Sequence, residues 1–302
     1  MGNAKVIVAG SINMDVVVRA ARHPRPGETL LGQSVQFFAG GKGANQAIAA
    51  HRLGARATLI ARVGDDSFGG SLRAFVSQEG LDTQRVLATG GASGTALITV
   101  ADSGENTIVV VPGANGALSP VDVEVDIEPG DVLVSQCEIP AQAIEYFFVR
   151  GKRPGALTLL NAAPARPLAP ALAAAVDILV VNESELATLA GTAVGARDTG
   201  TVIAAARSLQ SAIGNVVVTL GERGVVACLG PVVKTVPGRR VEAVADTTGA
   251  GDGFVGALAA RLAAGEPLAQ ALVFANAAAS ICVERPGAAA SMPTMAEVLA
   301  VL

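Results

Sequence analysis

An aspartate inside a glycine-rich run is the residue of this chain best placed to do chemistry. Asp252 follows Gly249, Ala250 and Gly251, and an apolar stretch runs from Phe254 to Leu262. Glycines at a loop-to-helix junction let backbone N–H groups approach an anion closely, and the helix N-terminus adds partial positive charge. A carboxylate there would repel the anion, so anion binding alone does not explain it. The pattern indicates an active site where a hydroxyl is deprotonated beside a phosphoryl group.

The same run formally matches the glycine spacing of a dinucleotide-binding loop, at Gly251, Gly253 and Gly256. That motif requires an acidic residue about 20 positions further on, at the end of a second strand. Here the run lies late in the chain, its second position is Asp252, and no such strand follows. We therefore reject a nicotinamide or flavin enzyme.

A second glycine-rich segment, residues 40–46, precedes a helical pattern and carries Lys42, Asn45 and Gln46. It is not a P-loop, because Gly43 follows Lys42 where Ser or Thr is required. Its cation and amides could bind a polyol. A plain glycine-rich turn explains the segment about equally well.

Polar residues also stand where predicted strands end. Asn13 and Asp15 follow the first strand at a spacing that places both side chains on one face, and Glu138 follows a later strand. Carboxylate and amide groups could hold vicinal hydroxyls there. Strand-end turns with local hydrogen bonds are the alternative, and these residues alone favour the turns.

Two further segments have both a structural and a functional interpretation. Asn182 and Glu185 are spaced as a capping box, which would explain them, although polar groups at a strand end can also hold hydrated Mg²⁺. Residues 219–224 most simply form a turn between strands, but they could lie along a nucleotide.

The elements that must position these residues follow an α/β pattern. Short β-branched runs alternate with Ala-rich helical segments, which predicts a mostly parallel central sheet with helices on both faces. The expected core strands are Val6–Ala9, Thr58–Arg62, Val132–Ser135, Leu157–Asn161, Ile178–Val181, Val216–Thr219 and Val225–Cys228. The expected helices are Gly43–Leu53, Phe68–Glu79, Gln142–Arg150, Thr201–Ser211, Gly251–Ala264, Pro267–Ile281 and Thr294–Val301.

Two regions break the alternation and predict a small β-sheet lid. Asp15–Phe38 and Thr95–Val111 each read as successive strands joined by a turn. Such strands could cover a site at the carboxyl ends of the core strands, where ligands usually bind. We expect one domain over residues 1–302, with the lid formed by segments of about 12–38 and 94–112.

Composition excludes several classes of protein. The 302 residues carry a formal net charge of −4, one Tyr and no Trp, which makes nucleic acid an unsuitable partner. Three widely spaced cysteines suggest neither disulfides nor a zinc site, and they indicate buried thiols in a reducing compartment. The chain shows neither a secretion signal nor an apolar stretch able to span a membrane, so we expect a cytoplasmic protein.

Taken together, five of these segments resemble, in order, those of the ribokinase or pfkB-type carbohydrate kinase family, and within it the ribokinases. They are Asn13-x-Asp15, residues 40–47, residues 182–185, residues 219–224 and residues 246–252. The resemblance implies ATP-dependent phosphorylation of a primary hydroxyl, with D-ribose as the expected acceptor. It also implies a β-sheet lid that helps to form a homodimer.

The resemblance assigns the candidate residues to four groups. Asp252 is the general base, with an anion hole at Gly249, Ala250 and Gly251. The sugar-binding positions are Asn13, Asp15, Gly41, Lys42, Gly43, Asn45, Glu138 and Asp252. The ATP positions are Asn182, Thr219, Leu220, Gly221, Glu222, Arg223, Gly224, Gly251 and Asn276, with Glu185 near Mg²⁺. A monovalent cation, K⁺, is expected at Asp246, Thr248, Cys282, Arg285, Gly287 and Ser291, mostly through backbone carbonyls.

Alternatives remain at this point. Within the enzyme class they are a kinase of deoxyribose, of a ketohexose or of a nucleoside, since the same groups that bind a diol could hold any of these. A non-catalytic regulator that binds a sugar or nucleotide is the alternative from another class. The carboxylate of Asp252 argues against it, because a binding protein has no need of a base.

Overall fold

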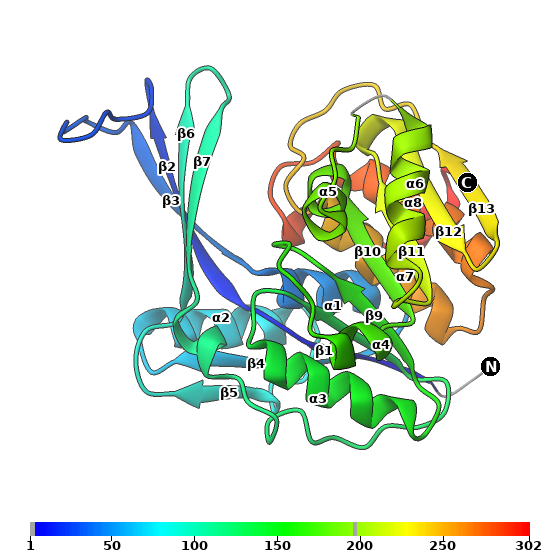
Figure 1. Cartoon of the computed structure of the whole chain (residues 1–302). Coiled ribbons are helices and arrows are strands. Elements are labelled where there is room, and N and C mark those ends of the chain that lie inside the picture. The colour runs from blue at the N-terminus through cyan, green and yellow to red at the C-terminus, as the bar shows by residue number, and fades with distance from the viewer. Residues whose placement is uncertain (1–3, 196–197) are drawn as a thin grey trace.

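The computed structural model describes residues 4–195 and 198–302. Within them, nine strands form one large sheet in the order β13-β12-β11-β10-β9-β8-β1-β4-β5 (Figure 1). The strands are β1 (Lys5–Ala9), β4 (Arg56–Gly64), β5 (Val86–Thr89), β8 (Val132–Gln136), β9 (Leu157–Asn161), β10 (Ile178–Asn182), β11 (Asn215–Thr219), β12 (Gly224–Leu229) and β13 (Val232–Pro237). β12 pairs antiparallel with β11 and with β13, and the other neighbours pair parallel.

The strand order changes direction at β1. From β1 the sheet continues through β4 and β5 on one side, and through β8, β9, β10 and β11 on the other. In open parallel sheets, ligands bind beyond the carboxyl ends of the strands at such a switch point. The residues that follow β1 and β8 therefore lie where this architecture places a site.

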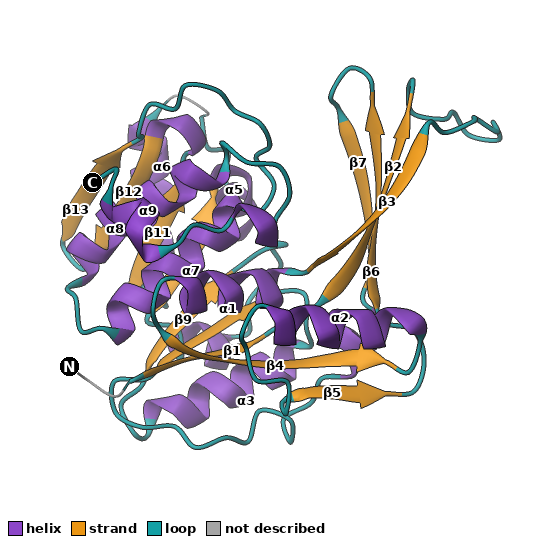
Figure 2. Ribbon diagram, turned by 180° about the vertical axis from the view of Figure 1, so that it is seen from behind, coloured by secondary structure: helices purple, strands orange, loops and turns teal. Residues whose placement is uncertain are grey.

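Helices cover both faces of the large sheet (Figures 1 and 2). One core contains residues of α1, α2, α7, α8 and α9, and the other contains residues of α3, α4, α5 and α6. Successive residues of β1 alternate between the cores, with Val6 and Val8 in the first and Ile7 and Ala9 in the second. The helices are α1 (Lys42–Arg52), α2 (Ser67–Gln78), α3 (Ala141–Lys152), α4 (Pro170–Ala174), α5 (Glu183–Ala190), α6 (Thr199–Leu209), α7 (Ala250–Ala263), α8 (Leu268–Cys282) and α9 (Met295–Leu299).

The predicted fold class is confirmed, since the sheet is mostly parallel and carries helices on both faces. Every helix and core strand expected from the sequence is present, with ends within two residues of the predicted ones. The sequence analysis gave no range for β5, β13 or the short helices α4 and α5, although it placed a capping box at the start of α5. These elements lie at the sheet edges or are short, so the periodic pattern has little length in which to show itself.

A second sheet of four strands, in the order β3-β2-β6-β7, projects from the large one (Figure 2). Its strands are β2 (Asn13–Ala20), β3 (Ser34–Gly40), β6 (Gly94–Ala101) and β7 (Asn106–Val111). β2 and β6 pair parallel although they are far apart in the chain, as expected for a small sheet assembled from both segments. The sheet comes from the two segments predicted to form the lid, although β3 continues past residue 38 to Gly40, and its movement as a lid stays a prediction.

No helix in the described parts of the chain combines the length and the apolar character needed to cross a membrane. The three cysteines are free and buried, as expected.

Candidate active site

Asp252 lies in the first turn of α7, and its carboxylate is buried. Its Oδ2 accepts a hydrogen bond from Asn45 Nδ2 at 2.9 Å, and its Oδ1 accepts one from Gln46 Nε2 at 2.9 Å. Both donors belong to the first turns of α1. The packing of α1 against α7 therefore sets the position of the carboxylate.

The N-terminus of α7, beside that carboxylate, has the backbone geometry of an anion-binding site. Gly249 is its N-cap, with φ of 79°, a left-handed conformation that L side chains rarely adopt. A Cβ at Gly249 would lie 2.8 Å from the Cα of Ala288, so space as well as conformation requires glycine here. The N–H groups of this first turn and the helix dipole attract negative charge.

Gly41 and Gly43 let the start of α1 pack closely against the end of β1. Gly41 is the N-cap of α1 with φ of 92°. A Cβ on Gly43 would come within 2.6 Å of the backbone of Gly10 and Ser11. These glycines therefore serve close packing, and that packing brings Lys42 and Asn45 to the site.

Three candidate sugar-binding side chains, Asn13, Asp15 and Glu138, are supplied by β2 and by the loop after β8. Asn13 Oδ1 accepts a hydrogen bond from Asn115 Nδ2 at 2.7 Å, which leaves the Asn13 amide hydrogens for another partner. Glu138 accepts the hydroxyl hydrogen of Ser11 at 2.5 Å. The sequence analysis missed Asn115, because it lies about 100 residues from its partner and no local spacing connects the two.

Carboxylates crowd around Lys42. The pKa of Asp15 is raised to about 7, chiefly by burial and also by nearby Glu138 and Asp252, with Lys42 opposing the shift. Burial likewise raises the pKa of Glu138, with Lys42 as the main opposing influence. The pKa of Lys42 is itself raised, chiefly by Asp252 and against the effect of burial. The site therefore holds the Lys42 cation beside two carboxyl groups, Asp15 and Glu138, whose ionisation burial disfavours.

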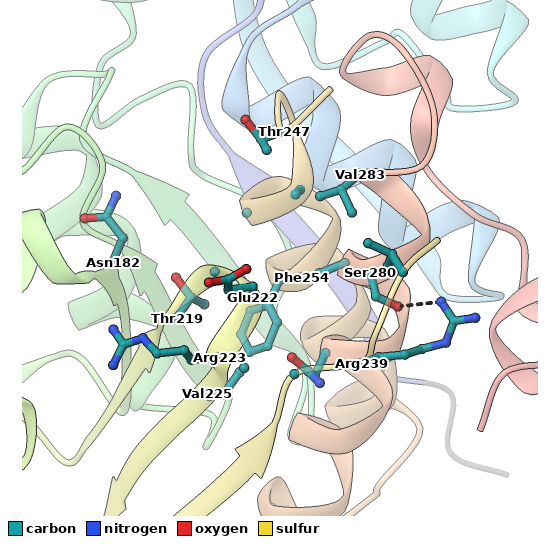
Figure 3. Close-up of a pocket in the computed structure, with 18 of the residues that line it drawn as sticks. Asn182, Thr219, Glu222, Arg223, Val225, Arg239, Thr247, Phe254, Ser280 and Val283 are labelled. Carbon is teal, nitrogen blue, oxygen red and sulfur yellow. Dashed lines mark hydrogen bonds between the residues drawn. The ribbon is translucent and has the colours of Figure 1, made fainter. Parts of the chain in front are cut away.

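A cavity of about 1230 Å³ opens beside the first turn of α7 (Figure 3). The predicted nucleotide residues that line it are Asn182, Thr219, Gly221, Glu222, Arg223, Gly224, Gly251 and Asn276. Leu220 is not among its lining residues, because its side chain is buried in the core that contains α5 and α6. A cavity of this size suits a nucleotide.

The sequence analysis missed the apolar part of this cavity. In Figure 3, Phe254 lies between Val225 on one side and Ser280 with Val283 on the other. Flat apolar surfaces of this kind accommodate a purine ring. Ser280 follows Asn276 at helical spacing on α8 and Val283 is the C-cap of that helix, so the prediction of Asn276 could have been extended to them.

A smaller cavity of about 210 Å³ connects the large one to Asp252. Its lining shares Asn182, Thr219 and Gly251 with the large cavity and adds Lys42 and Asp252. A phosphate chain entering from the large cavity would therefore end between a cation, the α7 N-terminus and the carboxylate.

Glu185 also lines the smaller cavity. The predicted capping box is present, with Glu185 Oε2 accepting from Asn182 N at 2.8 Å. Burial raises the pKa of Glu185. No group of three or more His, Cys, Asp or Glu side chains gathers for a metal within the described residues. That finding is compatible with Mg²⁺, which usually takes one or two carboxylates and keeps several waters.

The six candidate cation-binding residues lie in the loop before α7, at the end of α8, and in the segment after α8 that ends in a short 3-10 turn, and a hydrogen bond ties the loop before α7 to that segment. Asp246 Oδ2 accepts from Gly287 N at 3.1 Å, and its Oδ1 accepts from Thr248 N at 2.9 Å. The Cys282 thiol is buried and its Sγ lies 3.9 Å from Met292 Sδ. Arg285 pairs with Glu297, so its guanidinium is occupied and a backbone carbonyl oxygen is what this position would offer a cation.

Two of the three glycines that mimic a dinucleotide-binding motif serve helix packing, whereas an added Cβ at Gly251 would meet nothing within 4 Å. A Cβ on Gly253 would lie 2.5 Å from Cys282 Sγ, and one on Gly256 would lie 2.5 Å from Ala49 Cβ and 2.6 Å from Gln46 O. Gly256 thus lets α7 touch α1. The rejected motif has a structural explanation.

Comparison with known proteins adds three kinds of relative. Residues 3–295 match the family model described as pfkB family carbohydrate kinase. Ribokinase from Haemophilus influenzae is 40% identical, over 97% of this chain and 96% of that protein. Deoxyribokinase from Salmonella typhi is 37% identical, over 84% of each. The solved structure of Arabidopsis thaliana ribokinase complexed with ribose and ATP has a TM-score of 0.92 and 30% identity, over 100% of this chain and 99% of that one.

Proposed function

This chain belongs to the pfkB family of carbohydrate kinases, as the sequence analysis predicted, and on that premise we propose that it transfers the γ-phosphate of ATP to the primary hydroxyl of D-ribose. The observation that carries the proposal is the buried Asp252 carboxylate, which lines the smaller cavity beside the nucleotide-sized one and lies near enough to Asp15 of β2 to raise its pKa. Ribose is preferred to deoxyribose because the ribokinase relative matches over more of the chain.

The proposed reaction needs little covalent help from the protein. Asp252 accepts the proton of the sugar hydroxyl as its oxygen attacks the γ-phosphorus, and each carboxylate oxygen keeps a lone pair beyond its amide hydrogen bond. The N–H groups at residues 249–251 stabilise the charge that develops on the transferred group. Closure of the small sheet would exclude water as a competing acceptor.

Lys42, Mg²⁺ and K⁺ would supply the positive charge near the phosphates and the anion hole. Lys42 lines the smaller cavity, where it can neutralise the γ-phosphate. Glu185 would hold Mg²⁺ through its carboxylate and retained waters, and the ion would supply charge neutralisation along the phosphates. The loops around Asp246 and Gly287 would hold K⁺ with backbone oxygens and so stiffen the anion hole.

A panel of acceptors tests the substrate. ADP release is measured with ATP and Mg²⁺ and with ribose, deoxyribose, fructose or a nucleoside. We expect the highest kcat/KM for ribose. Preference for a nucleoside would reject ribose and leave the kinase fold, whereas no ADP release with any acceptor would favour the non-catalytic regulator.

We expect K⁺ to raise kcat severalfold over Na⁺ at equal ionic strength. The reason is the direct connection of the Asp246 loop to Gly249 and the start of α7, so an ion in that loop would order the anion hole. Initial rates in KCl and NaCl measure the effect. Equal rates in both salts would contradict a selective cation site.

The raised pKa of Asp15 predicts acid inhibition of sugar use. Because that pKa is about 7, Asp15 is protonated at lower pH and loses its strength as a hydrogen-bond acceptor for a sugar hydroxyl. We expect kcat/KM for the sugar to fall about tenfold per pH unit below about pH 7, while KM for ATP changes little. Asp15→Asn is the control. Its kcat/KM for the sugar should be low at every pH and should not fall further at acidic pH. A wild-type profile that stays flat down to about pH 6 would contradict the assignment.

The small sheet also supports a homodimer. Val17, Ile98 and Ile108 stand side by side across β2, β6 and β7, on the face that carries Asp15. Phe37 lies on the opposite face and packs against Phe68 of α2, with ring centroids 6.0 Å apart. Ile108 and Val110 are exposed on the Asp15 face, and Leu97 and Val109 are exposed on the opposite face, so the small sheet offers apolar side chains that a second copy of the chain would cover.

Ile108→Lys should therefore convert a dimer into monomers. Ile108 is 54% exposed, and a buried lysine at a self-complementary face would place like charges near each other. Analytical ultracentrifugation measures the outcome. Val121→Lys, at a residue 73% exposed and outside the small sheet, is the control that should stay dimeric. A dimer that survives Ile108→Lys would place the interface elsewhere.

A further inference from the structure

A chain of buried amides lies behind Asp252. Gln46 Nε2 donates to Asp252 Oδ1 at 2.9 Å and to Asn161 Oδ1 at 3.1 Å. Gln136 Nε2 donates to Gln46 Oε1 at 2.6 Å. These three amides come from α1, β9 and β8, and none of them takes part in the phosphoryl transfer proposed for Asp252.

Backbone geometry sets the direction of this chain. Asn161 Nδ2 donates to the carbonyl oxygen of Val180 at 3.2 Å, and a carbonyl can only accept. Asn161 Oδ1 must therefore face Gln46, so Gln46 must present its Nε2 to Asn161. The second hydrogen of that Nε2 is then available only to Asp252, while Gln46 Oε1 takes the hydrogen from Gln136. Gln46 cannot exchange its oxygen and nitrogen without breaking all three contacts.

Asn45, the other amide on Asp252, lacks this support. Its Oδ1 is buried without a hydrogen-bond partner among the described residues, so its amide can turn when a ligand arrives. The two neighbouring donors on Asp252 thus differ: the bond from Gln46 is held in place and the bond from Asn45 is adaptable.

This chain of amides also includes a polar atom that has no hydrogen-bond partner among the described residues. Gln136 Oε1 is buried and has no partner among the described residues, an arrangement that costs stability. Space for it depends on Gly10, because a Cβ there would lie 2.1 Å from Gln136 Oε1. A purely structural role would be served better by an apolar side chain.

We propose that Gln46 is a positioning residue for the base: oriented by Asn161 and Gln136, it holds Oδ1 of Asp252 so that the other carboxylate oxygen faces the sugar hydroxyl. This inference rests on the proposed function, since it assigns Gln46 a role only if Asp252 is the base. Gln46 does not touch the reacting atoms and acts through Asp252 alone.

A double-mutant cycle tests the proposal. Gln46→Met keeps the volume of the side chain and removes its amide, and it is made in the wild type and in Asp252→Asn. In the wild type we expect kcat to fall on the order of 10- to 100-fold with KM for ATP unchanged, the effect of losing one hydrogen bond to a charged group. In Asp252→Asn we expect Gln46→Met to cause no further loss of kcat.

Two further variants keep the test decisive. Gln136→Met removes only the donor that orients Gln46, so kcat should fall less than in Gln46→Met, and again only when Asp252 is present. If Gln46→Met does not fold, Gln136→Met tests the proposal in its place. Gln78→Met, at an exposed glutamine of α2, should leave kcat unchanged.

The outcomes separate the inference from the proposed function. Equal losses of kcat in both backgrounds, or none in the wild type, would overturn the positioning role. An Asp252→Asn variant that keeps wild-type turnover would instead overturn the proposed mechanism, whatever the glutamine variants do.

Discussion

Replacing Asp252 with asparagine is expected to lower kcat by about 10²- to 10⁴-fold, the usual contribution of a general base. The affinity for ATP should stay nearly unchanged, because Asp252 lines the smaller cavity and not the large one. The fold should tolerate the change. Gln46 can donate to the new amide oxygen, and Asn45 can turn its unpartnered Oδ1 toward the new NH₂ group.

Steady-state kinetics and nucleotide titration would measure these two effects separately. Asp126→Asn makes the same charge change at an exposed position and should leave kcat unaltered. Near-normal turnover of Asp252→Asn would remove Asp252 from the role of base. A matching loss of ATP affinity would instead indicate that the variant distorts the start of α7.

Gly256→Ala is expected to lower the free energy of unfolding by about 1 to 3 kcal/mol, although alanine ordinarily favours helices. The new Cβ would lie 2.5 Å from Ala49 Cβ and 2.6 Å from the carbonyl oxygen of Gln46. Neither is the tip of a flexible side chain, so α1 and α7 must move apart. Because both amides on Asp252 come from α1, kcat should fall together with stability.

Denaturant unfolding of the apo protein, combined with kinetics, checks this prediction. Gly70→Ala is the matched control, since Gly70 lies inside α2 with nothing within 4 Å of its added Cβ. That substitution should stabilise the protein by about 0.5 to 1 kcal/mol and leave kcat unchanged. If both substitutions stabilise, the close contact between α1 and α7 does not limit this site.

The sequence predicted the architecture well because local pattern determines it. β-Branched runs and Ala-rich helices each carry their own periodicity, so every predicted helix and core strand is present. The family and the kinase class were predicted from five ordered segments, and both are confirmed by the comparisons. The local capping box at Asn182 and Glu185 was also confirmed.

Other properties depend on residues that are far apart in the chain. Asn115 orients Asn13, and Phe254 meets Val225 across the large cavity, through contacts that no local spacing encodes. The pKa of Asp15 depends on burial and on Glu138, more than 120 residues away.

The glycine-rich run that contains Asp252 shows most clearly what sequence and what tertiary structure each determine. By itself, the sequence determined that Asp252 stands among glycines at the start of an apolar helix, because residue type and local periodicity carry that information. Only the tertiary structure decided what holds the carboxylate and why the later glycines are needed. Asn45 and Gln46 reach it from a helix about 200 positions earlier, and Gly256 lets that helix come close enough. Hydrogen bonds and close packing depend on distance in space, which local sequence pattern does not encode.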